Sequence, residues 1–500
     1  MQKISHFFEK LVVFYLMGIT LITVIQNFSV VNYSCLYILA ILAMVIVCLF
    51  IYKGHISAKT WFLIAMFISI FLRLSFALMV DTPIVSDFSM AYEAAKGLAQ
   101  GDATFIHENF YFSCWAYMTP FVWYESLILR VCDNAIVLRI LNVFYMVGTN
   151  ALVYLIAKTF VSEKAAALGA LLYAVYPAPI LLSSVLTNQH LATFLLYLGV
   201  WILLRWRSFY AYVLAGVALS LGNLIRPEGI VIVLTILFML MVILLRPSEK
   251  RKRFVLAGQV SVLLLSYFLV SFGASTAFKI SGINENGVAN TRPEWKFVLG
   301  LDFQSIGKYS EENIPILSIE DDAERKSELV RIVWESYKQS DGLWNFLKSK
   351  TKEMWAVREP IFWSMAHIDA SRQILNGLPL TYGTLQEWVL AFDKSLYILI
   401  LGALAMGSVI YLRNASHRKT GALLLMTMIA GNYTIYLFIE IQTRYRYFIM
   451  PAIFAAAAVA FDLFHKADCR HLWSRLKNRV GSFFTLPDIN DEEPLTGNGL

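Results

Sequence analysis

The chain has 500 residues, of which 58% are hydrophobic and only 15% are charged, and its mean hydropathy is +0.60. Soluble proteins carry charged side chains at roughly a quarter of their positions, so this composition excludes an ordinary water-soluble enzyme. The formal net charge is +7, but the basic residues lie in short clusters between apolar stretches. That arrangement is typical of an oriented membrane protein and argues against nucleic-acid binding.

Apolar runs near the ~20 residues needed to cross hydrocarbon recur along almost the whole chain. They predict an all-α integral membrane protein with about twelve transmembrane helices. The expected spans are Leu11 to Val31, Tyr33 to Tyr52, Trp61 to Val80, Ala135 to Ala157, Ala165 to Val185, Leu191 to Leu204, Phe209 to Ile225, Gly229 to Leu245, Phe254 to Gly273, Ser395 to Leu412, Gly421 to Ile439 and Tyr447 to Phe464.

The loops between these spans predict the orientation of the protein. Every second loop is basic, as at Lys53 and Lys59 and in the run from Lys250 to Arg253. Because basic loops stay on the cytoplasmic side, both termini are expected inside, in a plasma membrane, and the polar segments 81–134 and 274–394 outside. The lack of a eukaryotic retention signal favours a bacterial membrane.

This pattern divides the chain into six segments. They are N-terminal transmembrane helices (1–80), a first extracytoplasmic loop (81–134), central transmembrane helices (135–273), a second extracytoplasmic loop domain (274–394), C-terminal transmembrane helices (395–465) and a cytoplasmic tail (466–500).

Both outer segments contain stretches that predict helices at the membrane surface. Phe88 to Ala99 follows Ser86 and Asp87, either of which is a suitable N-cap, and Gly101 ends it. In the second segment, apolar spacing from Leu329 to Tyr337 predicts a one-sided helix, and Ser318 together with Asp321 is the expected start signal. Leu343 to Trp355 mixes tryptophans with lysines, as an interfacial helix does.

The five cysteines show neither a zinc-binding pattern nor the density of a disulfide scaffold. Cys114 and Cys132 lie in the same outer loop, where a disulfide between them is one option and two free thiols are the other.

Five arginines lie outside the membrane or in the outer half of a span, against the usual bias of basic residues. They are Arg73, Arg139, Arg226, Arg444 and Arg446. A guanidinium group grips phosphate in a bidentate manner, so a cluster at this depth predicts a binding site for a lipid phosphate. The alternative for any single arginine is simple snorkelling to lipid headgroups.

Asp87 opens the first outer loop. A carboxylate at the membrane surface is suited to take a proton from an acceptor hydroxyl, whereas the structural alternative is a cap for the helix that follows. Tyr92 and Glu125 either support such a base or serve as interfacial anchors.

Gln189 and His190 begin the sixth expected span from its outer end. His190 either binds a phosphate or sugar hydroxyl or is a solvated turn residue. The sequence contains no P-loop, GxGxxG or HExxH motif, so it offers no support for nucleotide hydrolysis or metalloprotease chemistry.

With these motifs in this order, the chain resembles the GT-C class of polytopic glycosyltransferases. It is most similar to the branch that contains the dolichyl-phosphate-mannose protein mannosyltransferases and the bacterial lipid A aminoarabinose transferase. The matching segments are Ser-Asp-Phe at 86–88, Thr-Asn-Gln-His at 187–190, Asn-Leu-Ile-Arg-Pro-Glu at 223–228, and Glu-Ile-Gln-Thr-Arg-Tyr-Arg-Tyr at 440–447 with Pro451.

The resemblance implies a polyprenyl-phosphate sugar as donor and Asp87 as the catalytic base. It implies Arg226 and Arg444 as ligands of the donor phosphate, with Arg73 and Arg139 as weaker additions. Many relatives have an Asp-Glu pair at the position where Asp87 is followed by Phe88 in this chain. This departure leaves three classes of acceptor open, which are a glycan, a lipid and a protein.

The remaining site candidates stand within the same motifs. Tyr445 is assigned to the donor phosphate, and Tyr92, Gln189, His190 and Glu440 are assigned to substrate binding. Because fixed guanidinium groups can neutralise the leaving phosphate, the hypothesis needs no metal or other cofactor.

The expected reaction is an inverting displacement at the anomeric carbon of the sugar, with Asp87 deprotonating the incoming hydroxyl. Two alternatives remain open at this stage. One is a flippase or transporter for a lipid-linked saccharide, which predicts symmetric halves and a polar path through the membrane. The other is a polysaccharide polymerase or ligase, which takes a glycan chain as donor.

Overall fold

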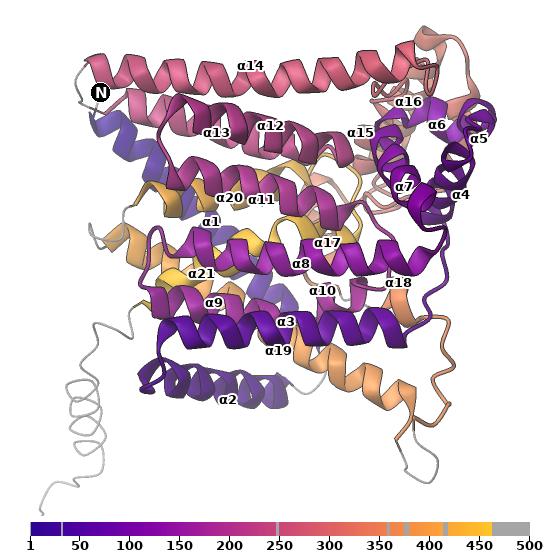
Figure 1. Cartoon of the computed structure of the whole chain (residues 1–500). Coiled ribbons are helices and arrows are strands. Elements are labelled where there is room, and N and C mark those ends of the chain that lie inside the picture. The colour runs from indigo at the N-terminus through magenta and orange to yellow at the C-terminus, as the bar shows by residue number, and fades with distance from the viewer. Residues whose placement is uncertain are drawn as a thin grey trace, which may run out of the picture.

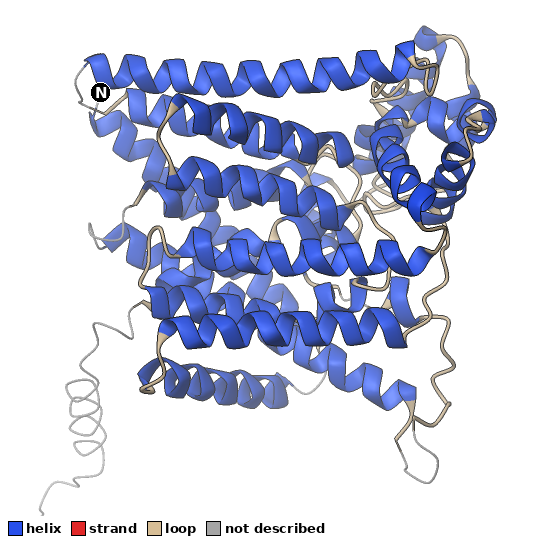
Figure 2. Cartoon of the chain, viewed as in Figure 1, coloured by secondary structure: helices blue, strands red, loops and turns tan. Residues whose placement is uncertain are grey.

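The computed structural model of the chain describes residues 2–31, 34–246, 250–357, 361–374, 380–413 and 419–462. Within these ranges the protein is all-helical and contains no β-strand (Figure 2). The expected cytoplasmic tail, 466–500, lies outside the described residues.

Long helices run side by side through the molecule (Figure 1). Six of the described helices are long and apolar enough to cross a membrane: α1 (Gln2–Ser29), α2 (Ser34–Lys53), α3 (Ala58–Met79), α8 (Ala135–Ala157), α14 (Lys250–Ile280) and α19 (Tyr382–Arg413). Five shorter apolar helices accompany them: α11 (Gln189–Arg205), α12 (Phe209–Ile225), α13 (Gly229–Leu244), α20 (Thr420–Ile435) and α21 (Met450–Phe461). The fold is therefore that of a multi-pass membrane protein, as predicted, although the count of twelve spans is not confirmed.

The expected span from Ala165 to Val185 is not one helix. It is broken into α9 (Glu163–Ala174) and α10 (Pro177–Leu182). Pro177 has no N–H to continue the helical hydrogen-bond ladder and disfavours helical backbone in the residue before it, so α9 must end here.

Arg73, on α3, compensates for that break. Its guanidinium is fully buried and donates to the carbonyl oxygens of Ala174, at 2.9 Å, and Tyr173, at 3.2 Å. The last carbonyls of a helix have no partner within it, and a positive charge is favourable at that end. Arg73 therefore ties the end of α9 to α3.

The helices outside these spans gather at one end of the bundle (Figure 1). From the first outer segment they are α4 (Asp87–Ala99), α5 (Thr104–Glu108), α6 (Phe110–Cys114), η1 (Ala116–Met118) and α7 (Thr119–Val131). From the second they are α15 (Trp295–Gly300), η2 (Ile314–Ser318), α16 (Asp322–Lys338), α17 (Leu343–Trp355) and α18 (Phe362–Met365). A 3-10 turn, η4 (Thr443–Phe448), leads from α20 into α21 at the same end.

Several local predictions are confirmed. α17 has the expected bounds. α16 is a helix as expected, but its cap is Asp321, whose side chain accepts from the backbone N–H of Glu324, whereas Ser318 is the last residue of η2. Gly101 adopts φ 87° just after α4, a conformation that glycine tolerates best. The optional disulfide between Cys114 and Cys132 is absent, since both are free thiols, one buried and one exposed.

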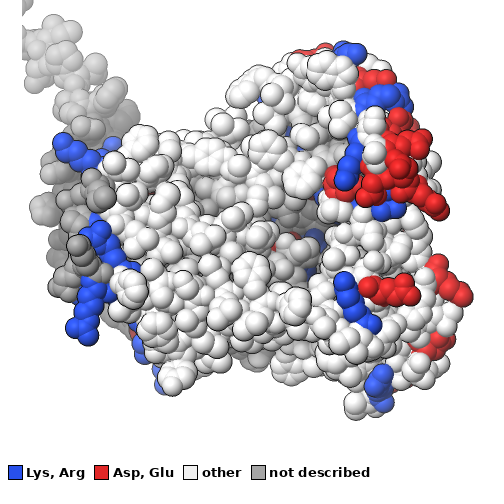
Figure 3. Space-filling model, turned by 90° about the horizontal axis from the view of Figure 1, so that it is seen from above, with Lys and Arg blue, Asp and Glu red and all other residues white. Residues whose placement is uncertain are grey.

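On the face seen in Figure 3, the charged side chains gather at the two ends of the bundle, and the surface between them is almost uncharged. Of the described residues in that view, Lys and Arg dominate one end, whereas the end that holds the outer-segment helices carries both signs. The buried core between the ends contains the alanine-rich faces of α9 and α21, which pack closely against each other.

Candidate active site

A cavity of about 780 Å³ lies where the outer-segment helices meet the bundle. Its wall combines the start of α4, the α6 and η1 region, residues 295–317, the end of α17 with α18, and the loop 440–445. These parts of the wall are far apart in the sequence, so only the tertiary fold creates the cavity. Five predicted site residues line it: Asp87, Arg226, Glu440, Arg444 and Tyr445.

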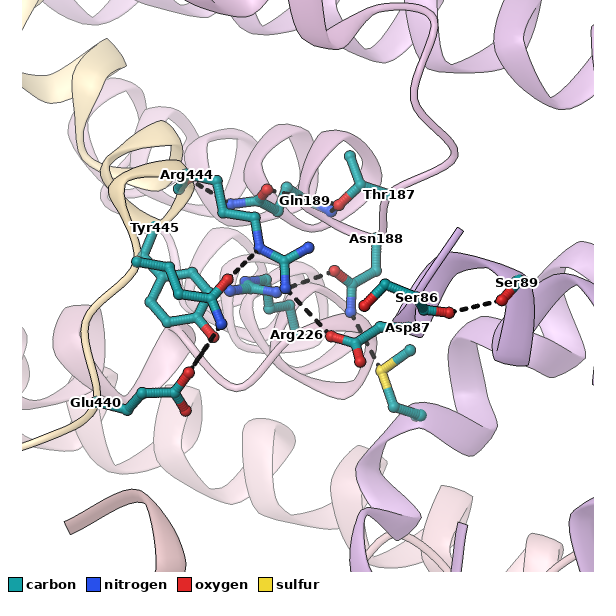
Figure 4. A network of polar contacts seen from close by, with 12 residues as sticks. Ser86, Asp87, Ser89, Thr187, Asn188, Gln189, Arg226, Glu440, Arg444 and Tyr445 are labelled. Carbon is teal, nitrogen blue, oxygen red and sulfur yellow. Dashed lines mark hydrogen bonds and ion pairs between the residues drawn. The ribbon is translucent and has the colours of Figure 1, made fainter. Parts of the chain in front are cut away.

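Asp87 and Arg444 form an ion pair inside this cavity. The carboxylate oxygen Oδ2 of Asp87 lies 3.1 Å from a terminal nitrogen of Arg444, and the two side chains point toward each other (Figure 4). The Asp87 side chain is 45% exposed, so a substrate can reach it, whereas that of Arg444 is 7% exposed.

The backbone before Asp87 is strained. Ser86 has φ 57°, which is unusual for a residue with a side chain, and it makes no side-chain cap to α4. Such strain costs about 1 to 3 kcal/mol and is often found at functional sites. Asp87 is the first residue of α4, and its hydrogen-bonded partner is Arg444 rather than the helix it begins.

Arg444 is held from several sides. Its Nε donates to the side chain of Gln442 at 2.6 Å, and its own carbonyl accepts from Gln189 at 2.9 Å. The guanidinium lies over the ring of Trp363, at 4.5 Å from the centroid, and over Phe88, at 5.0 Å. These contacts fix the orientation of the planar guanidinium group of Arg444. Less side-chain conformational entropy is therefore lost when an anion binds to it.

Arg226, in the turn after α12, is the second guanidinium of the cavity. Its Nε donates to Glu228 at 2.7 Å, a terminal nitrogen donates to Asn188 at 3.1 Å, and its Cζ atom lies 5.0 Å from the centroid of the Tyr445 ring. Burial lowers the pKa of Arg226, but the adjacent Glu228 carboxylate raises it further, and the net pKa is above the usual range. Arg226 therefore keeps its charge in this enclosed place.

Lys296 was not singled out by the sequence, yet it lines the cavity beside both arginines. Its ammonium is paired with the fully buried carboxylate of Glu440, which also accepts from Gln442 at 2.8 Å and from Tyr445 at 3.4 Å. Burial lowers the pKa of Lys296, but Tyr445 and Glu440 raise it above its ordinary value. A single lysine in a long polar loop carries no spacing pattern, so no local signal identified it.

Other predicted residues are placed outside the cavity wall. Arg73 is buried against α9, as described above. Arg139 donates to the carbonyl of Thr82 at 2.6 Å and lies 3.8 Å from Asp81, which attaches α8 to the segment before α4. Tyr92 lies on α4 beneath the ammonium of Lys96.

Gln189 and His190 also lie behind the cavity rather than in its wall. The side-chain amide of Gln189 donates to the backbone carbonyl of Arg444, as described above. The ring nitrogen Nδ1 of His190 is 2.8 Å from the hydroxyl of Tyr447, and Nε2 is 3.1 Å from the carbonyl oxygen of Leu182. His190 is fully buried, which disagrees with the expectation of a solvated turn residue.

Lys350, on α17, is a buried lysine that supports the site from outside the cavity wall. Its Nζ donates to the carbonyl oxygens of Gly300 and Leu437. It therefore connects α17 to the segment that follows Lys296 and to the segment that precedes Glu440. The Glu440 N–H also donates to the carbonyl of Lys296 at 2.8 Å. This network positions the two charged residues relative to each other.

We expect the stability of the folded protein to depend on pH through Lys350. Burial lowers the pKa of Lys350 to about 7, although Glu440 opposes this, and an unfolded lysine titrates near 10.4. Between about pH 7 and pH 10.4, the unfolded chain binds more protons at Lys350 than the folded protein does. The contribution of Lys350 to the free energy of unfolding is therefore fully present above about pH 10.4, and it is lost as the pH falls to 7.

The test compares thermal unfolding of the parent and Lys350→Met in detergent at pH 7 and pH 9. Between pH 7 and pH 9, the Tm of the parent should rise relative to that of the variant. The hydrogen bonds lost in the variant shift its Tm by the same amount at both pH values and do not affect this comparison. Equal pH dependence in both proteins would contradict this assignment.

Together these features define a multi-pass membrane protein with a polar, ion-paired cavity at one end of its helix bundle. Residues 119–271 match the family model described as Dolichyl-phosphate-mannose-protein mannosyltransferase. The match confirms the resemblance to this GT-C family over those residues, which include Arg226 but neither Asp87 nor Arg444. No curated protein matches the chain.

Solved structures of an archaeal oligosaccharyltransferase from Archaeoglobus fulgidus are also similar to the chain. One, in complex with an inhibitory peptide and a dolichol-phosphate, has 15% identity and a TM-score of 0.46, over 85% of this chain and 52% of that one. Another, in complex with Zn and sulfate, has 16% identity and a TM-score of 0.48, over 84% and 51%. The chain therefore spans about half the length of the solved structures it matches.

Proposed function

We propose that the protein is a glycosyltransferase that moves a sugar from a polyprenyl-phosphate donor to an acceptor in the cell envelope. The observation that carries this proposal is the contact between Asp87 and Arg444 inside the cavity. It joins an accessible carboxylate to an arginine with a fixed orientation, which are the two groups that such a transfer needs. The family match over residues 119–271 supports the same reaction class.

In the proposed reaction, Arg226 and Arg444 bind the donor phosphate. The acceptor oxygen forms a bond to the anomeric carbon while the bond from that carbon to the phosphate oxygen breaks. The proton of the acceptor hydroxyl passes to Asp87, and the electron pair remains on the phosphate, whose growing charge the two guanidinium groups stabilise. Attack from the face opposite the leaving group inverts the anomeric configuration.

The ion pair between Asp87 and Arg444 also keeps the base in place before the substrate arrives. When the donor phosphate binds to Arg444, the carboxylate loses part of its partner's charge and becomes a better proton acceptor. The second arginine, Arg226, has its own carboxylate in Glu228 and does not compete for Asp87.

The proposed location follows the charge distribution. The basic end of the bundle is assigned to the cytoplasm, with both termini, and the end that holds the cavity to the extracytoplasmic face of the plasma membrane (Figure 3). The donor therefore presents its sugar on the outer side.

The test is release of free polyprenyl phosphate by the purified protein in detergent, from a panel of polyprenyl-phosphate monosaccharides, with crude envelope as acceptor. Release that depends on the acceptor supports the proposal, and the donor that reacts identifies the sugar. Donor binding without release from any of them would contradict a transferase and would favour a transporter. Release only from long-chain glycan donors would favour a polymerase.

A further inference from the structure

Three aromatic residues of the cavity wall are about half exposed. Phe110, on α6, is 49% exposed, Tyr309 is 50% exposed, and Phe362, on α18, is 56% exposed. All three line the cavity, yet they belong to three separate segments of the chain. Residues that line a cavity and are also half exposed mark its opening, which is here an aromatic rim.

The loop that carries Tyr309 is attached to the 440–445 loop, which also carries Arg444. Ile306 and Gly307 adopt φ 58° and 77°, which turns the chain sharply, and the carbonyl of Gly307 accepts from the N–H of Ile441 at 2.9 Å. Tyr309 and Asp87 line the same cavity, and burial and the negative charges of Glu311 and Asp87 raise the pKa of the Tyr309 hydroxyl.

The polar groups at the rim carry no excess of positive charge. The ammonium of Lys308 lies 3.1 Å from the Glu353 carboxylate, and Glu311 adds a further negative charge to the wall. A paired lysine and carboxylate offer hydrogen-bond donors and acceptors without attracting an anion. The cationic groups deeper in the cavity, Arg226 and Arg444, are those assigned to the donor phosphate.

We propose that this aromatic rim binds the acceptor and that the acceptor is a neutral saccharide. The inference rests on the proposed transferase function. One face of a sugar ring presents C–H groups that are weakly positive, and the face of an aromatic ring is negative, so the two stack favourably. The hydroxyl groups of the sugar then find partners in Lys308 and Glu353, and the hydroxyl that reacts points toward Asp87.

Two other acceptor classes fit the rim less well. An anionic polymer would meet Glu311 and Glu353 without an unpaired cation beside them. An extended peptide is commonly bound by adding a strand to a sheet edge, and no strand exists among the described residues.

The test uses saturation-transfer NMR of the intact protein in detergent, with maltotriose and mannotriose as neutral probes and a Ser/Thr decapeptide as competitor. We expect saturation of the sugar-ring protons by the parent protein. Phe110→Ala and Tyr309→Ala should each weaken saccharide binding about tenfold. Trp344→Ala is the matched control, because this ring on α17 is 77% exposed and lies outside the cavity wall, and it should bind as the parent does.

A parallel assay separates this inference from the proposed function. In the donor-release assay the two rim variants should raise the KM for acceptor while leaving release at saturating acceptor almost unchanged. Saturable peptide binding without saccharide binding would overturn the inference, as would saccharide binding that both rim variants leave intact. Either result leaves acceptor-dependent release from the donor, and thus the transferase function, untouched.

Discussion

Replacing Arg444 with alanine is expected to lower the release of polyprenyl phosphate by at least about 100-fold. A preorganised donor directed at a developing negative charge contributes about 10²- to 10³-fold in rate. Arg444 is preorganised by Gln442, by the ring of Trp363 and by the carboxylate of Asp87. The measurement is the initial rate with the reactive donor, together with the Tm of each protein in detergent.

Two variants make this result specific. Arg444→Lys keeps the charge but not the planar fork, so it should recover only part of the lost rate. Arg331→Ala removes an exposed arginine on α16 that is paired with Glu328 and Glu335 and does not line the cavity, and this variant should react as the parent does. Parent-like turnover by a folded Arg444→Ala protein would refute the assignment of Arg444 to the donor phosphate.

The second large effect is expected for Asp87→Asn. A positioned general base contributes about 10²- to 10⁴-fold, and asparagine cannot accept the proton of the acceptor hydroxyl. The variant should therefore lose kcat by that amount. Its affinity for the donor should stay the same or increase, because Arg444 loses the carboxylate that competes with the phosphate.

Binding and chemistry must be measured separately for this variant. Donor affinity comes from titration with a polyprenyl-phosphate sugar in the absence of acceptor, and kcat comes from acceptor-dependent release. Glu93→Gln is the matched control, since Glu93 is exposed on the same helix, α4, and does not line the cavity. A loss of donor affinity with unchanged kcat would show that Asp87 only orders Arg444.

Periodicity and composition were sufficient to predict the bounds of those helices whose ends are marked by residues within the same segment. The bounds of α12 and α17 agree with the sequence prediction, because an unbroken run of compatible residues lies between clear end signals. The sequence also singled out Asp87, Arg226 and Arg444, which line one cavity in the fold, since charged groups at the outer ends of apolar spans are costly and conspicuous.

Two features of the fold were not predicted, although the residues that cause them are visible in the sequence. The break between α9 and α10 follows from Pro177, but the apolar run around it concealed the proline's effect. The bare pattern assigned Arg73 to a phosphate, whereas in the fold its guanidinium donates to the carbonyl oxygens of Tyr173 and Ala174 at the end of α9.

Only the tertiary structure decided which residues share the cavity. Lys296 lies on α15, a helix of six residues, Tyr309 lies in the loop after it, and Trp363 lies in a helix of four residues, so none of them belongs to a periodic pattern. Their place depends on backbone hydrogen bonds from the 440–441 segment and on close packing between segments hundreds of positions apart. Such contacts form only when the whole chain has folded, because no single segment contains both partners.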